Sequence, residues 1–312
     1  MSSDTDRIKE KLPMTEVVRH YVKLEKSGRN LKGKSPFNTE RTPSFFVDPE
    51  KNLFHCFSSG KGGDIFTFVQ EVEGVDFPTA LKMLAEQAGV SLSRQGQKEQ
   101  SERSKLYQIM EDATKYYEVQ LRKDTAPVSY LEDRGLTKET LQTFRIGYAR
   151  AGWTHLYDFL KKKGYGDTLI QKAGLGVQGK RGGLYDQFRE RIMFPIADTQ
   201  GRIIAFSGRI FVKEGSTTDP KKTGKYVNSP ETPIYDKSRV LYGYDQARRT
   251  MMTEDHCIVV EGQMDLVMSH QAGITNTVAL SGTALTDEQL SLIQRFTNTI
   301  TIALDADRAG ID

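Results

Sequence analysis

The stretch 257–265 reads CIVVEGQMD, and the stretch 300–310 reads ITIALDADRAG. Each begins with a short apolar run that is typical of a buried strand and continues into acidic residues. Between these stretches, a helical pattern at 264–270 precedes an apolar run at 277–280, and a second helical pattern follows at 287–296. Short apolar strands that alternate with helices predict a parallel α/β sheet.

The acidic residues at the ends of these strands predict a cation site. Glu261 follows the first strand, and Asp305 and Asp307 follow the last one. Ligands of open parallel sheets bind beyond the carboxyl ends of the strands, so we expect the three carboxylates to meet at one edge. Hard oxygen ligands favour Mg²⁺ or Mn²⁺, and Gly262 permits a tight turn. Asp265 is expected to support catalysis from the helix start, where an acid also stabilises the helix.

The distribution of charge agrees with phosphate chemistry near this edge. The net charge of the chain is only +3, yet residues 150–225 include 15 basic and 7 acidic side chains, whereas residues 255–312 include 2 basic and 8 acidic ones. A basic segment followed by an acidic one indicates a track for a polyanion beside a metal site. The alternative is a pair of ordinary domains whose charges happen to differ.

The two acidic motifs resemble those of the TOPRIM domain, which primases, type IA and type II topoisomerases and some nucleases share. Motifs that precede them narrow the resemblance to the bacterial DnaG-type primases, in the family's order and over nearly the whole chain. These motifs lie at 130–136, 190–196, 201–209, 225–232 and 237–243. The resemblance implies an α+β multidomain protein with a small β-ribbon domain with helices, a mixed α+β basic subdomain and an incomplete α/β TOPRIM parallel sheet.

We expect four segments along the chain. They are a ribbon domain at 1–92, a polar linker or solvated helix start at 93–104, the basic subdomain at 105–252 and a truncated TOPRIM domain at 255–312. Inside the ribbon domain, the residue patterns predict strands at 44–47 and 53–57 and helices at 14–22, 64–73 and 77–88.

The resemblance assigns nucleic-acid and nucleotide contacts to the basic subdomain. The residues expected to line its groove are Arg134, Arg191, Arg209, Lys225, Tyr226, Asn228 and Lys237. Arginine offers bidentate contacts to phosphate and lysine a point charge, so these side chains suit both a template strand and an incoming triphosphate. Such contacts hold a strand without reading its sequence.

The ribbon domain resembles a zinc ribbon that has lost most of its ligands. The family pattern places a Cys-x2-His pair and a Cys-x2-Cys pair where this chain has Ser35, Asn38, Cys56 and Ser59. A structural zinc site needs about four thiolate or imidazole ligands, so the zinc expected in the family is predicted to be absent here. His55 should point away from Cys56 along the strand. The small polar replacements favour a hydrogen-bonded cluster at the old metal position.

Without the metal, we expect the ribbon domain to depend on its apolar core. Its predicted members are Phe45, Phe54, Phe57, Phe66, Phe68, Leu81 and Leu84. Because the family's ribbon binds single-stranded template, the alternative is that some of these aromatic rings stack on bases.

Composition excludes membrane and secreted classes. No run approaches the roughly 18 apolar residues of a membrane span, and the first residues lack the pattern of a signal peptide. Cys56 and Cys257 are the two cysteines, too far apart for a disulfide framework, which favours a reducing, cytoplasmic compartment. Cys257 is expected to be a small core residue.

The resemblance implies a DNA primase, a DNA-directed RNA polymerase that joins ribonucleoside triphosphates into short primers on single-stranded DNA, with Mg²⁺ or Mn²⁺ as cofactor. The alternatives are a non-catalytic single-stranded-DNA-binding fragment and another TOPRIM enzyme, a topoisomerase or nuclease. In the family the TOPRIM domain continues beyond the position of residue 312, and a later domain binds the replicative helicase. We therefore expect a fragment or a broken reading frame that primes weakly or not at all by itself.

Overall fold

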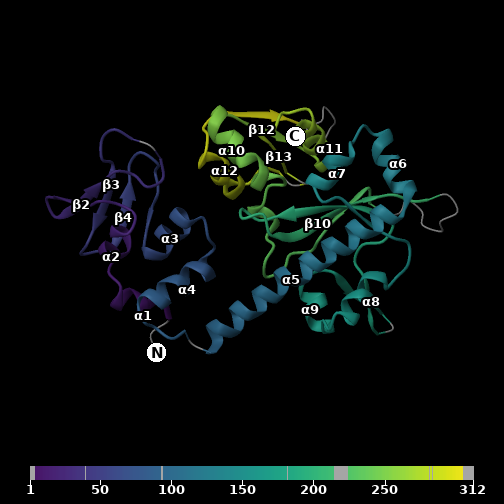
Figure 1. The fold of residues 1–312 in the computed structure, drawn as a ribbon, viewed down its shortest axis with the longest axis horizontal. Coiled ribbons are helices and arrows are strands. Elements are labelled where there is room, and N and C mark those ends of the chain that lie inside the picture. Colours follow the sequence, from purple (N-terminus) through teal and green to yellow (C-terminus); the bar gives the residue numbers. More distant parts are fainter. Residues whose placement is uncertain are drawn as a thin grey trace. The chain divides into compact units, whose positions relative to one another are not determined.

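The computed structural model describes residues 4–38, 40–92, 94–180, 182–213, 224–280, 282 and 284–304. The chain divides into two compact units, Met1–Glu102 and Arg103–Asp312 (Figure 1). Residues 94–104 of the predicted linker belong to helix α5, Arg94–Lys123, so the division between the units falls inside this helix. The four predicted segment limits stay a prediction.

The first unit is built on a five-stranded antiparallel sheet. Its strands neighbour one another in chain order: β1 (Glu25–Ser27), β2 (Asn30–Gly33), β3 (Phe45–Asp48), β4 (Leu53–Cys56) and β5 (Gly62–Gly63). The helices are α1 (Asp4–Lys11), α2 (Met14–Arg19), α3 (Ile65–Glu73) and α4 (Phe77–Gln87). Side chains of β3 and β4 alternate as a half-buried sheet requires, so Cys56 is buried and His55 points outward, as predicted.

Two aspartates are the N-cap residues of the helices that pack on this sheet. Asp64 accepts hydrogen bonds from the backbone N–H groups of Phe66 and Thr67 at the start of α3. Asp76 accepts one from the backbone N–H of Thr79 at the start of α4. Such caps satisfy backbone donors that have no partner inside the helix. The helices predicted at 64–73 and 77–88 are confirmed.

The apolar core of the first unit differs from the prediction at one residue. Phe45, Phe54, Phe66, Phe68 and Leu84 are buried, and Leu81 packs at the margin. The prediction for Phe57 was wrong, because 69% of its surface is exposed. Phe57 follows the end of β4 on the outer side, where its ring meets those of His55 at 4.5 Å and Phe46 at 5.5 Å.

The second unit contains a four-stranded antiparallel sheet in the order β11 (Tyr226–Asn228), β10 (Ile203–Ile210), β9 (Arg191–Ala197) and β6 (Gly147–Ala149). Helix α5 packs across it (Figure 1), and the rings of Tyr117 and Phe206 lie 5.4 Å apart. The helices α6 (Thr125–Asp133), α7 (Lys138–Thr143), α8 (His155–Lys162) and α9 (Asp167–Lys172) and the hairpin β7 (Gly176–Gln178) and β8 (Leu184–Asp186) complete this part.

The predicted parallel sheet is confirmed. Its order is β13 (Thr277–Ala279), β12 (Cys257–Val260) and β14 (Ile300–Ala303). Helices α10 (Tyr244–Glu254) and α12 (Asp287–Gln294) share one core with Val259, whereas α11 (Gln263–Gln271) belongs with Val260 to the other core, so both faces of the sheet are covered. Cys257 is fully buried, as expected for a small core residue. The predicted α+β fold class is therefore correct.

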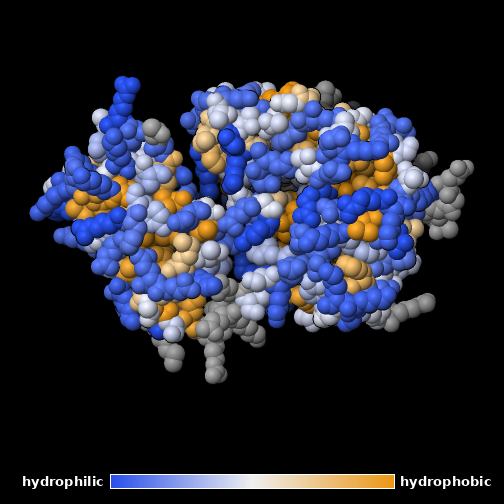
Figure 2. All heavy atoms as spheres, viewed as in Figure 1, coloured by the Kyte–Doolittle hydropathy of each residue, from blue (hydrophilic) through white to orange (hydrophobic). Residues whose placement is uncertain are grey.

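The face of each unit that is visible in Figure 2 is mostly polar. Hydrophilic residues cover most of the face seen in Figure 2. Exposed large hydrophobic side chains, such as Phe57, Trp153 and Met252, come from separate segments of the chain. Within the described residues, no helix combines the length and the apolar character that crossing a bilayer requires.

The close approach of α5 to the antiparallel sheet gives a first prediction. A Cβ atom at Gly147 would lie 2.5 Å from Tyr117 Cβ and 2.7 Å from the Tyr117 carbonyl carbon. Gly147→Ala should therefore force β6 away from α5 and lower the free energy of unfolding by about 1–3 kcal/mol, measured by denaturant unfolding. A Cβ atom at Gly166 would meet no heavy atom of the described residues within 4 Å, apart from its chain neighbours. Gly166→Ala is therefore the control and should cost less. Equal losses would contradict the described packing.

Candidate functional site

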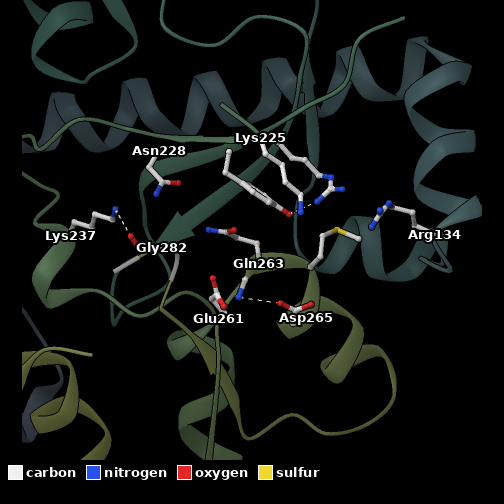
Figure 3. Close-up of a pocket in the computed structure, with 12 residues that line it drawn as sticks. Arg134, Lys225, Asn228, Lys237, Glu261, Gln263, Asp265 and Gly282 are labelled. Atoms are coloured by element: carbon white, nitrogen blue, oxygen red, sulfur yellow. Dashed lines mark hydrogen bonds between the residues drawn. The ribbon is translucent and has the colours of Figure 1, made fainter. Parts of the chain in front are cut away.

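A pocket of about 570 Å³ in the second unit brings most of the predicted site residues together (Figure 3). Its polar lining includes six of the seven predicted phosphate-binding residues and both described acids of the TOPRIM-like motif. These eight residues are Arg134, Arg209, Lys225, Tyr226, Asn228, Lys237, Glu261 and Asp265. Gly262, Gln263, Met264 and Gly282 complete the lining.

Glu261 occupies the carboxyl end of β12. Its Oε2 atom is buried and accepts no hydrogen bond from any residue that the structure describes. A buried carboxylate oxygen without a donor is costly unless a positive charge compensates it. The environment of Glu261 therefore fits a cation ligand.

Asp265 shapes the turn between β12 and α11. Its Oδ2 atom accepts a hydrogen bond of 3.1 Å from the backbone N–H of Gly262. A Cβ atom at residue 262 would lie 2.8 Å from that same oxygen, so a larger residue there would displace the Asp265 carboxylate. Asp265 thus stabilises the helix start, and its side chain also lines the pocket, while its predicted catalytic role stays a prediction.

The remaining predicted metal ligands, Asp305 and Asp307, lie outside the described residues. Strand β14 runs parallel to β12, and Ala303 pairs with Val260, so the two strands end at the same edge of the sheet. Over the described part of the chain, no group of three or more His, Cys, Asp and Glu side chains is placed to hold a metal. Among the three predicted ligands, only Glu261 has a described position.

The basic side of the pocket combines fixed and free cations. Arg209 donates hydrogen bonds to the hydroxyl oxygens of Tyr226 at 2.9 Å and Tyr130 at 3.1 Å. Burial raises the pKa of Tyr226, so its hydroxyl stays neutral at neutral pH. Lys237 donates to the Gly282 carbonyl at 3.3 Å. The Lys225 ammonium group makes no hydrogen bond or ion pair with a described residue, which leaves it available to a ligand.

The structure places Arg191 elsewhere. Only 3% of its surface is exposed, and it does not line the pocket. Its guanidinium donates to the carbonyl oxygens of Gly208 at 2.9 Å and Gly224 at 3.1 Å. Arg191 therefore holds the backbone immediately before Lys225 instead of facing the pocket. Arg191 is the first residue of the otherwise apolar strand β9, and this position was the sequence signal for its burial.

Sequence reasoning missed three polar contributors to this site. Gln263 is buried and lines the pocket between the two acids. Tyr130 orients Arg209 and lies under the guanidinium of Arg134, which is 5.5 Å from its ring centre. The Gly282 carbonyl holds Lys237. Gln263 lies in the motif at 257–265 and Tyr130 in the motif at 130–136. Their positions inside these motifs were the sequence signal for a role in the site.

In the first unit, the predicted zinc positions lie in a hydrogen-bonded cluster. Cys56 Sγ donates to Ser35 Oγ at 3.3 Å, and Ser58 Oγ donates to Asn38 Oδ1 at 3.1 Å. Burial tends to raise the pKa of Cys56, but hydrogen bonds with Ser35, Ser58 and Ser59 outweigh it and bring the pKa to about 7. The sequence did not indicate Ser58 as a member of this cluster.

Three family models match the chain. They are the CHC2 zinc finger over residues 1–100, the N-terminal domain of the DNA primase catalytic core over 116–248 and a Toprim-like model over 258–312. All three match in the order that the motifs predicted.

Known primases resemble the chain over long stretches. The DNA primase of Listeria monocytogenes is 38% identical over 319 residues, which cover 98% of this chain and 50% of that protein. The structure of the zinc-binding and RNA polymerase domains of Aquifex aeolicus primase has 33% sequence identity and a TM-score of 0.61, covering 100% of this chain and 74% of that one.

A third relative has been solved with DNA. The RNA polymerase domain of Mycobacterium tuberculosis primase DnaG, in complex with a double-stranded DNA oligomer with a 6-nucleotide overhang, has 32% identity and a TM-score of 0.60, covering 66% of this chain and 65% of that one. The chain spans about half the length of the curated primases that it matches. The shared motifs, domain order and fold confirm the predicted resemblance, and the chain belongs to the DnaG-type primase family.

Proposed function

We propose that this chain carries the template-binding and nucleotide-binding parts of a DNA primase, a DNA-directed RNA polymerase that makes short RNA primers on single-stranded DNA. The observation that carries the proposal is one pocket in which Arg134, Arg209, Lys225 and Lys237 lie around Glu261. Its volume of about 570 Å³ lies in the range of small-ligand sites, which is roughly 300–1,000 Å³. Ribonucleoside triphosphates and a template strand are the proposed occupants.

The basic residues act by holding phosphate. Arg209 is fixed by Tyr226 and Tyr130, so little side-chain entropy remains to be lost when its guanidinium contacts a phosphate. Lys225 has no bound partner among the described side chains and adds a mobile point charge. Together they would orient a triphosphate against the acidic edge without reading a base.

The acidic residues are proposed to hold the cofactor. Glu261, Asp305 and Asp307 would ligate Mg²⁺ or Mn²⁺, with Asp265 supporting the turn that carries Glu261. When bound, such an ion neutralises developing phosphate charge and helps to activate a primer 3′-hydroxyl. The buried, unpartnered Oε2 of Glu261 supports this assignment.

The first unit is proposed to contact the template. Phe46, His55 and Phe57 form an aromatic group on the outer face of its sheet, and Lys32 is the cross-strand neighbour of Phe46. Exposed rings beside a cation suit base stacking and phosphate contact on single-stranded DNA. The exposure of Phe57 favours the stacking alternative over the core role for this residue.

Other properties of the whole protein are carried over from the family as proposals. These are a cytoplasmic location and a contact with the replicative helicase. A second candidate function is single-strand binding without catalysis. It is favoured by the cations of the pocket, by the exposed ring of Phe57 and by the replacement of three of the four zinc-ligand positions of the family. Primer synthesis separates the two functions.

Removal of a free cation should change the salt dependence of DNA binding. Lys225→Ala should reduce the log–log salt slope for single-stranded DNA by roughly 0.7, because one phosphate contact and its released counterion are lost. Lys162→Ala is the matched control, since Lys162 is an exposed lysine of α8 outside the pocket, and its slope should not change. Fluorescence anisotropy over a salt series measures both slopes. An unchanged slope for Lys225→Ala would place this lysine away from the bound strand.

Cation binding should stabilise the second unit. Mn²⁺ should raise the melting temperature modestly, because a ligand that binds only the folded state stabilises it by linkage. Glu261→Gln should remove most of this rise, whereas Glu288→Gln, at an exposed acid of α12, should retain it. Calorimetric scans with and without Mn²⁺ provide the comparison. A full Mn²⁺ response in Glu261→Gln argues against the assigned metal ligand.

A further inference from the structure

The zinc ion that the family implies does not fit the side chains of the first unit. Of the four corresponding residues, Ser35, Asn38, Cys56 and Ser59, only Cys56 offers a thiolate or imidazole ligand. A structural zinc site uses about four such ligands or carboxylates. The described residues of this unit also bring no three His, Cys, Asp or Glu side chains together at a metal-binding distance. The two ligand-bearing segments of the family therefore need a different physical connection here.

Glu40 connects the two ends of the first segment, residues 35–44, by hydrogen bonds. Its Oε1 atom accepts hydrogen bonds from the backbone N–H groups of Ser35 at 2.7 Å and Ser44 at 2.9 Å. Its Oε2 atom accepts a further bond from Ser44 Oγ. Burial tends to raise the pKa of Glu40, but the hydrogen bonds from Ser44 and Ser35 outweigh it and bring the pKa to about 2, so the side chain is ionised at neutral pH. Hydrogen bonds to an ionised acceptor are stronger than neutral ones.

Further polar contacts join this loop to the end of β4. Ser44 Oγ lies 2.7 Å from Ser58 Oγ, and the Ser44 carbonyl accepts a 3.0 Å hydrogen bond from the backbone N–H of Phe57. Cys56 Sγ reaches Ser35 Oγ at 3.3 Å, and Ser58 Oγ reaches Asn38 Oδ1 at 3.1 Å. The contacts connect the 35–44 loop to the 56–59 segment. In the family pattern, one ligand pair lies in each of these segments.

We propose that the Glu40 cluster (Ser35, Asn38, Glu40, Ser44, Cys56 and Ser58) replaces zinc as the cross-link of the ribbon. Glu40 supplies the central acceptor, and the hydroxyl, thiol and amide groups extend the connection to the second segment. The cross-link needs no cation. It also fixes the backbone of Phe57, because Ser44 accepts the Phe57 N–H, and thereby the aromatic group on the outer face.

The test combines metal analysis with hydrogen exchange on the full chain. Purified, untagged protein should contain no stoichiometric zinc, and EDTA should leave amide exchange over residues 35–59 unchanged. Glu40→Ala should speed exchange of the Ser35 and Ser44 amides about tenfold or more, because both lose their acceptor. Glu40→Gln retains an oxygen for these amides and should give a smaller increase. Glu50→Ala, at an exposed acid of the same unit, should change nothing.

Three outcomes would overturn the proposal. One tightly held zinc per chain would show that a metal ion supplies the cross-link. Faster exchange across residues 35–59 after EDTA treatment would show the same. Identical exchange in Glu40→Ala and the unsubstituted chain would show that Glu40 connects nothing. If Glu40→Ala unfolds the first unit while Glu50→Ala does not, the cross-link is supported, and Glu40→Gln then measures its strength. None of these readouts depends on primer synthesis, so they do not test the proposed function.

Discussion

The buried Oε2 atom of Glu261, in a pocket that four cationic side chains also line, is the constraint on which the proposed site depends. Glu261 Oε2 has no donor among the described residues, and the low dielectric of a buried position makes such an oxygen expensive. Arg134, Arg209, Lys225 and Lys237 line the same pocket, yet the structure records no ion pair between them and Glu261. A cation bound to the carboxylate and a polyanion bound to the basic residues would relieve both sets of charges together. This complementarity is the physical basis for assigning metal-dependent phosphate chemistry.

Two sheets of different kinds create that arrangement. In the parallel sheet, the pairing of Val260 with Ala303 brings two strand ends to one edge, where Glu261 begins the turn. In the antiparallel sheet, Arg209 pairs with Tyr226 across β10 and β11, and this register places the guanidinium beside the tyrosine hydroxyl. Arg191 is buried and holds the carbonyl of Gly224, the residue before Lys225. The acidic edge therefore comes from a strand end, whereas Arg209 is positioned by its cross-strand neighbour and Arg134 and Lys237 come from the segments after α6 and before α10.

Residue patterns predicted the features that periodicity and local motifs control. The strands and helices of the parallel sheet, the turn at Gly262 and the first-unit helices at 64–73 and 77–88 all follow from local sequence. The features that the sequence did not predict depend on tertiary contacts. The charge of Arg191 did not reveal two backbone carbonyls that would bury it, and the aromatic character of Phe57 did not reveal that β4 ends before it. Glu40 could not be identified from spacing because its partners are backbone N–H groups that only the loop geometry brings together.

The proposed activity depends above all on the binding of the catalytic cation by Glu261. Its most direct measurement is ribonucleotide incorporation on single-stranded DNA with Mg²⁺ or Mn²⁺, by this chain extended with the remaining catalytic core of a primase relative. The extended protein should make primers, and its Glu261→Gln variant should lose activity by roughly 100-fold or more, because the charge that holds the cation is gone. Glu288→Gln should prime like the unsubstituted protein. Primer synthesis by Glu261→Gln at the unsubstituted rate would show that Glu261 does not bind the catalytic cation.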